Sequence, residues 1–161
     1  MLVSSRWNDL RARGGLWVVA QFALMAAIVA AWFVPPRWPG SLRLPFSVAG
    51  AVLATVGLVL VFWSRRSLGD AFTPFPQPRP GGKRVEAGPY RLVRHPMYGG
   101  AILLFAGISL FISVAALVLS GVLALFWRAK SEAEERALAA RYPEYDAYRR
   151  RTPQRFLPRI Y

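Results

Sequence analysis

One histidine, two arginines and a pair of glutamates are the side chains in this sequence best suited to chemistry. His95, the only histidine, stands in the segment GPYRLVRHPMYGG, residues 88–100, together with Arg91 and Arg94. Pro96 biases His95 toward extended backbone, so a helix is expected to begin at about Pro96. Backbone N–H groups at a helix start are unpaired and point toward anions. The segment is therefore suited to an anionic or carboxylate-bearing ligand.

The glutamate pair stands further along the chain, in a stretch of good helix formers. Residues 128–141 favour a helix, and Glu132 precedes Arg136 by four residues in the stabilising orientation. Glu134 and Glu135 lie about 100° apart on such a helix, so one or both can face the histidine segment. The alternative is that these acids form the solvated face of a charged helix.

The residue types that are missing exclude several kinds of chemistry. The chain has no Cys and one His, which argues against a disulfide framework, a thiol nucleophile and a zinc site built from His or Cys. No metal is expected. No P-loop or GxGxxG fingerprint and no internal repeat is present. The chemistry is therefore expected to come from a bound cofactor.

The elements that position these residues are apolar helices. Of the 161 residues, 55% are hydrophobic, yet the net charge is +13. Residues 14–36 and 44–64 are charge-free runs, each near the roughly 20 residues that cross a bilayer. A third run, residues 96–127, would reach about 48 Å as one helix. The sequence predicts an all-α integral membrane protein.

The distribution of basic residues indicates how the third run is threaded. If residues 96–127 form a hairpin that turns near residues 111–114, 19 of the 21 Lys and Arg lie on one side and 2 on the other. The positive-inside rule favours this arrangement. We expect about four transmembrane helices, the last two forming a hairpin, with both termini cytoplasmic in an inner or plasma membrane. Each half of the hairpin would reach only about 22 Å, so it could be short, tilted or incompletely spanning.

The whole chain, residues 1–161, is expected to form one membrane domain. Residues 1–64 would supply two N-terminal transmembrane helices, and residues 65–161 a cofactor-binding loop, the hairpin and a cytoplasmic C-terminal helical segment. The loop is expected to start at Arg65 and to stay extended, because it is rich in Pro and Gly. Most of the basic charge flanks apolar runs, where it meets lipid headgroups. We therefore expect membrane lipids and no nucleic acid as partners.

These segments resemble a known group of enzymes. GPYRLVRHPMYGG, an apolar hairpin and then EERALAARYPEYDAYRRRTPQRFLP are similar to the isoprenylcysteine carboxyl methyltransferase and phospholipid methyltransferase family of integral-membrane proteins. The likeness covers residues 68–158 and includes the RHPxY box and the Glu-Glu pair in the same order. Pro143 departs from the pattern, since many relatives have Gly after an aromatic residue there. Residues 1–64 carry little of the family signature.

The resemblance implies S-adenosylmethionine as cofactor and methyl donor, bound on the cytoplasmic side. The cofactor-binding residues that it implies are Gly88, Tyr90, Arg94, His95, Pro96, Tyr98, Gly99, Glu134 and Glu135. Arg94 or His95 would donate hydrogen bonds to the carboxylate of the methyl donor, and Glu134 or Glu135 would accept from its ammonium or ribose hydroxyls. Arg94 and His95 are the catalytic candidates. His95 has the side chain suited to act as a base near neutral pH, and a cofactor-positioning role is the other possibility.

Three functions remain open at this point. The first is a membrane methyltransferase acting on a lipid-like or isoprenoid-type acceptor. The second is a membrane sterol or enone reductase with a nicotinamide cofactor, and the third is a non-catalytic membrane adaptor. In the adaptor, Arg91 and Arg94 would be simple membrane anchors and His95 would fill a turn. Residues 1–64 do not identify the acceptor, because they contain Gln21 as the lone amide within the apolar runs.

Overall fold

The structure, a computed structural model, describes residues 14–35, 38–78 and 85–158. Its regular elements are helical, as predicted. The five α-helices among the described residues are α2 (Gly15–Ala31), α3 (Gly40–Leu68), α4 (Pro96–Ile112), α5 (Val114–Arg141) and α6 (Tyr145–Arg151). Two short 3-10 helices, η1 (Gly69–Ala71) and η2 (Gly88–Arg91), lie in the connection between α3 and α4.

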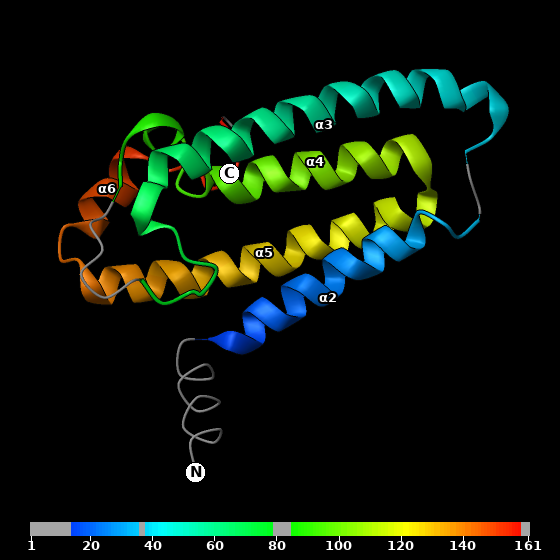
Figure 1. The fold of residues 1–161 in the computed structure, drawn as a ribbon. Coiled ribbons are helices and arrows are strands. Elements are labelled where there is room, and N and C mark those ends of the chain that lie inside the picture. The colour runs from blue at the N-terminus through cyan, green and yellow to red at the C-terminus, as the bar shows by residue number, and fades with distance from the viewer. Residues whose placement is uncertain (1–13, 36–37, 79–84, 159–161) are drawn as a thin grey trace, which may run out of the picture.

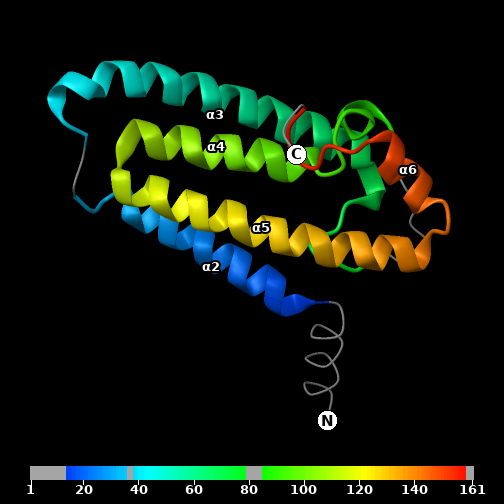
Figure 2. The ribbon, with the colours of Figure 1, turned by 180° about the vertical axis from the view of Figure 1, so that it is seen from behind.

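The four long helices lie side by side in a bundle. Figures 1 and 2 show α3 beside α4, α4 beside α5, and α2 along the other side of α5. The short helix α6 lies at one end of the bundle, near the end of α5 and the connection between α3 and α4. Segments distant in the sequence therefore meet at this end.

The predicted hairpin is present. Helix α4 ends at Ile112 and α5 begins at Val114, while Ser113 between them is extended, with φ −152° and ψ 136°. The turn lies within the predicted range, residues 111–114. The Ser113 hydroxyl donates to the carbonyl of Val34 at 3.3 Å, which fixes the hairpin turn to the end of the first apolar run.

Two of the described helices are long and apolar enough to cross a membrane. They are residues 40–71 and residues 114–141, in which the most apolar stretch of 18 residues has a mean hydropathy of 2.2 and 1.5, respectively. Helices α2 and α4 are apolar but have 17 residues each, or about 25 Å at about 1.5 Å per residue. Length and composition therefore support two crossings, and the expected third and fourth remain predictions.

The bounds of the first two expected helices differ from those in the structure. The first apolar run was expected to be helical over residues 14–36, but α2 ends at Ala31. The second apolar run predicts a helix over residues 44–64 with the loop starting at Arg65, but α3 begins at Gly40 and continues to Leu68. Arg65 and Arg66 stand in the last turn of α3, where positive charge is favourable. The helix ends at Leu68, and the residue that follows, Gly69, has a φ of +51° that suits glycine.

Glycines bring α3 and α4 into backbone contact. A Cβ atom at Gly57 would meet the backbone of Gly100 and Leu104, and one at Gly107 would meet the backbone of Gly50 and Ala54. Small residues at helix interfaces in membranes permit such close approach. The contact fixes α4, and with it the histidine segment at its start, against α3.

Candidate functional site

The histidine segment is held by the C-terminal end of the described chain. The N–H of Arg94 donates to the carbonyl of Gln154 at 3.0 Å, and the N–H of His95 donates to the carbonyl of Arg155 at 2.7 Å. Helix α4 begins at Pro96, as predicted. The neighbouring glycine, Gly99, has no room for a side chain because the carbonyl of Phe156 lies against it.

His95 lies between the two glutamates. Its Nε2 is 3.1 Å from Oε1 of Glu135, and its Nδ1 is 3.5 Å from Oε2 of Glu134. The exposed fraction of the His95 side chain is 8%. Neighbouring positions on α5 thus reach opposite nitrogens of one buried ring, and both predicted carboxylates face the histidine segment. They do not form a merely solvated face.

Arg94 is bound by Glu135 and by backbone carbonyls. Its Nε donates to Oε1 of Glu135 at 2.9 Å, and its Nη1 donates to the carbonyls of Thr152 and Pro153. Arg155 adds a second guanidinium, with Nε 3.5 Å from Glu135. Glu135 therefore joins the histidine segment, α5 and the C-terminal residues through charge-assisted contacts, which are the stronger kind of hydrogen bond.

Tyr98 lies in a stack of rings beside this cluster. Its ring is stacked on His95 at 5.7 Å and on Trp127 at 5.6 Å between ring centroids. The Tyr98 hydroxyl donates a short hydrogen bond to Glu134. The Nζ of Lys130 lies 5.5 Å from the centre of the same ring. The stacking contacts hold the Tyr98 ring in place, and its hydroxyl in turn orients the Glu134 carboxylate.

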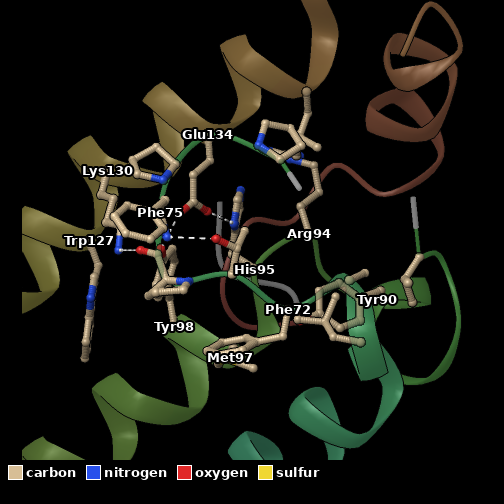
Figure 3. Close-up of a pocket in the computed structure, with 18 of the residues that line it drawn as sticks. Phe72, Phe75, Tyr90, Arg94, His95, Met97, Tyr98, Trp127, Lys130 and Glu134 are labelled. Atoms are coloured by element: carbon tan, nitrogen blue, oxygen red, sulfur yellow. Dashed lines mark hydrogen bonds and ion pairs between the residues drawn. The ribbon is translucent and has the colours of Figure 1, made fainter. Parts of the chain in front are cut away.

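A cavity of about 370 Å³ opens beside these side chains. Figure 3 shows Arg94, His95, Tyr98, Lys130 and Glu134 around it, with Phe72, Phe75 and Met97 among the apolar side chains. Its walls come from α2, α3, α4, α5, α6 and the loop that follows η1. The volume falls in the range of about 300–1,000 Å³ that is common for small-molecule sites. Most of the lining side chains are apolar, and Arg94, Lys130 and Glu134 are the charged ones.

The predicted site residues divide into two groups. Five line the cavity, namely Tyr90, Arg94, His95, Tyr98 and Glu134. The other four do not line the cavity and instead keep the lining segments in position. They are Gly88, Pro96, Gly99 and Glu135. Gly88 has φ +58°, and a Cβ there would collide with Ser67 of α3. Arg91 is exposed and does not line the cavity.

Two tyrosines that line the cavity, Tyr90 and Tyr145, are themselves largely buried. Burial, with smaller effects of Tyr148 and Glu134, raises the pKa of the Tyr90 phenol above its ordinary value. Burial, followed by the charge of Glu135, raises the pKa of Tyr145. Both phenols therefore stay protonated at physiological pH. The carbonyl of Tyr90 accepts a hydrogen bond from the Tyr148 hydroxyl at 2.7 Å, which attaches α6 to the histidine segment.

Sequence reasoning missed the polar cluster around Lys130. The Lys130 Nζ donates to Oε1 of Gln21 at 2.8 Å and to the carbonyl of Pro74 at 2.9 Å. The indole N–H of Trp127 donates to the same Gln21 oxygen at 3.0 Å. Two signals were present in the sequence. Gln21 is the lone amide of an apolar run, and Lys130 stands four residues before Glu134, on the same helix face.

Fold and site together define an all-helical membrane protein with a polar cluster at one end of its helices. The sequence matches the phospholipid methyltransferase family over residues 46–145. The chain belongs to this family. The matched region includes most of α3, the histidine segment, the hairpin and both glutamates, and it ends before most of α6.

Two curated relatives are named for metal resistance. The chain is 33% identical over 156 residues to the cobalt-zinc-cadmium resistance protein CzcN of Cupriavidus metallidurans. It is 30% identical over 154 residues to the nickel-cobalt-cadmium resistance protein NccN of Alcaligenes xylosoxydans xylosoxydans. Each match covers 93% of the chain, which spans 65% and 66% of the lengths of these relatives. The described residues contain no group of three or more His, Cys, Asp and Glu side chains placed to hold a metal ion.

Proposed function

We propose that this protein is an integral-membrane, S-adenosylmethionine-dependent methyltransferase that acts on a lipid-like acceptor. The observation that carries the proposal is the cluster of Arg94, His95, Glu134 and Glu135, which borders a mainly apolar cavity in a chain of the phospholipid methyltransferase family. The family supports methyl transfer, and the cavity supports the choice of an apolar acceptor.

The chemistry of the cavity wall suits the methyl donor. S-adenosylmethionine supplies a methyl group already activated by its sulfonium, and it carries a carboxylate, an ammonium and ribose hydroxyls. Glu134 offers a carboxylate to donors in the cavity, and the rings of Tyr98 and Phe72 offer apolar surface. Glu135, Gly88, Pro96 and Gly99 would keep the binding groups in place.

The protein's own contribution is then to orient the reactants and exclude water. With an activated methyl group, holding a nucleophile in line supplies much of the rate. His95 would take the proton of an amine or thiol acceptor, whereas a carboxylate acceptor would need no base. Arg94 would support catalysis by keeping His95 and its segment in place through Glu135 and the C-terminal carbonyls.

The apolar side of the cavity suggests where the acceptor would lie. Phe22 and Met25 on α2, Val61 on α3 and Ala101 on α4 line it. An acceptor with a hydrocarbon chain would place that chain along these residues and its reactive head near His95. We further propose that the basic segments around the site face the cytoplasm, with four membrane helices and both termini on that side.

Binding of the cofactor product tests the proposal most directly. The chain purified in detergent should bind S-adenosylhomocysteine in a calorimetric titration, and membranes containing it should transfer a labelled methyl group to a lipid-extractable product. Binding of NADPH in place of S-adenosylhomocysteine would favour the reductase. If the folded chain binds neither S-adenosylhomocysteine nor NADPH, the methyltransferase proposal is refuted and the non-catalytic adaptor remains.

A further inference from the structure

Lys130 is a buried cation that the family resemblance did not assign. The exposed fraction of this residue is 1%. Its ammonium donates hydrogen bonds to two neutral oxygens, those of the Gln21 amide and the Pro74 carbonyl. An ammonium has three donors, and Lys130 lines the cavity. A buried charge is costly unless it is paired, so an anion in the cavity would stabilise it.

The other basic side chains on the cavity wall, Arg94 and His95, already contact carboxylates. Arg94 contacts Glu135 at 2.9 Å and gives its Nη1 to two carbonyls. His95 lies between Glu134 and Glu135. Of these three basic side chains, Lys130 is thus the one that hydrogen-bonds to neutral oxygens only. This makes Lys130 better suited than Arg94 to an incoming carboxylate.

Glu134 stands one helical turn beyond Lys130 on α5. Residues four apart on a helix lie on the same face, with Cβ atoms about 5–6 Å apart. Figure 3 shows Lys130 and Glu134 reaching from the same helix toward the region of Tyr98 and His95. Glu134 accepts a hydrogen bond from Tyr98, and Lys130 donates hydrogen bonds to Gln21 and Pro74. One wall therefore presents a positive and a negative group side by side, each fixed by other residues.

A fixed cation and a fixed carboxylate at this spacing complement the two charges of an α-amino acid. We propose that Lys130 binds the carboxylate, and Glu134 the ammonium, at the amino-acid end of the methyl donor. The inference rests on the proposed function and specifies it further. It assigns the carboxylate to Lys130 rather than to Arg94 or His95, and it leaves those two residues beside the reacting groups.

A series of ligands separates this role from a structural one. S-adenosylhomocysteine has both charges, its decarboxylated analogue has only the ammonium, and 5′-methylthioadenosine lacks the amino-acid end. Lys130→Met should weaken S-adenosylhomocysteine binding about 10- to 150-fold, the range for a hydrogen bond to a charged group. The same variant should bind the decarboxylated analogue and 5′-methylthioadenosine as the wild type does. Titration calorimetry on the full chain measures each affinity.

Glu134→Gln provides the complementary test. This variant should lower the affinity for both ligands that carry the ammonium and leave the affinity for 5′-methylthioadenosine unchanged. A second variant, Gln21→Glu, tests the role of Lys130 while keeping the lysine. It places a carboxylate near the Nζ of Lys130 without changing the size of residue 21. This variant should also lower the affinity for S-adenosylhomocysteine selectively, and it guards against the case in which Lys130→Met does not fold.

The outcomes are distinguishable. If Lys130→Met weakens all three ligands equally, Lys130 is a structural residue and the inference is wrong. If neither Lys130→Met nor Gln21→Glu changes any affinity, the carboxylate is bound elsewhere and the inference is also wrong. If the folded wild-type chain binds none of the three ligands, the proposed function fails and the inference fails with it.

Discussion

Oε1 of Glu135 lies 3.1 Å from Nε2 of His95, although the two residues are 40 positions apart in the sequence. The same oxygen accepts a hydrogen bond from Nε of Arg94. Glu135 is 7% exposed and is not among the residues that line the cavity. One carboxylate thus fixes two consecutive residues of the histidine segment from behind, and its neighbour Glu134 faces the ligand space. The adjacent glutamates therefore have different consequences when substituted.

Glu135→Gln should mainly reduce stability. The substitution removes the charge that holds Arg94 and His95, and losing a hydrogen bond to a charged group costs about 1.5–3 kcal/mol. Thermal unfolding of the purified chain in detergent measures the effect. Glu132→Gln is the matched control on the same helix, because Glu132 is 43% exposed and pairs with Arg155 at the surface, where ion pairs contribute about 0–1 kcal/mol. Equal melting temperatures for both variants would contradict the assigned role.

Tyr98→Phe should reduce ligand affinity more than stability. The ring is retained, so its stacking on His95 and Trp127 persists, but the hydrogen bond to Glu134 is lost. Glu134 would no longer be fixed toward the cavity. We expect the affinity for S-adenosylhomocysteine to fall about 10-fold, the equivalent of about 1.4 kcal/mol. An unchanged affinity for Tyr98→Phe would show that Glu134 does not depend on this hydrogen bond.

Gly57→Ala should destabilise the bundle. The added methyl group would collide with the backbone of Gly100 and Leu104, which cannot rotate away as a side chain could. Overpacking of this kind costs about 1–3 kcal/mol. Gly121→Ala is the control, because a Cβ there meets nothing within 4 Å, and Ala is favoured over Gly in a helix by roughly 0.5–1 kcal/mol. The two variants should shift the melting temperature in opposite directions, and a shared direction would argue against the close contact of α3 and α4.

Tyr148→Phe should loosen the attachment of α6 to the histidine segment. It removes the buried hydrogen bond to the Tyr90 carbonyl, and an unpaired buried acceptor costs about 1–3 kcal/mol. Hydrogen exchange of residues 88–95 should increase relative to the wild type. Arg150→Gln on the exposed face of the same helix should leave the exchange unchanged. Unaltered exchange in Tyr148→Phe would mean that α6 is held mainly by packing.

The side of the membrane occupied by the site can be measured with single cysteines, since the chain has none. Asp146→Cys and Asp70→Cys should react with an impermeant thiol reagent from the cytoplasmic side, and Ser41→Cys from the opposite side. The reason is the 19 to 2 division of basic residues between the two sides. If residues 70 and 146 react from different sides, the hairpin does not return the chain to the same face.

Local patterns in the sequence were sufficient for most of the fold. The apolar runs predicted the helices, and charge balance predicted the hairpin, whose turn at Ser113 lies within the expected range. The start of α4 at Pro96 followed from proline geometry. Helix ends were less predictable. Arg65 and Arg66 marked a charge boundary in the sequence, but their position in the last turn of α3 is favourable, so the helix continued past them.

The candidate site was predictable where its residues belong to one motif. The histidine segment and the glutamate pair are recognisable from their residue types, and they meet in the structure. The contacts of Lys130 with Gln21 and Pro74 were not predictable, because three separate segments must pack before these groups meet. Which of the two glutamates lines the cavity, Glu134 or Glu135, depends on the rotation of α5 about its axis. Sequence spacing alone does not determine this rotation.

The pairing of the histidine segment with the C-terminal residues has a consequence for biosynthesis. Arg94 binds the carbonyls of residues that follow it by 58 and 59 positions. When the histidine segment leaves the ribosome, these partners have not yet been synthesised. The apolar helices can enter the membrane one after another, but the polar cluster can be completed only when residues 152–156 have emerged. Insertion of the bundle and maturation of its site are thus separate events, and a ribosome stalled between them would hold a membrane-embedded but incomplete protein.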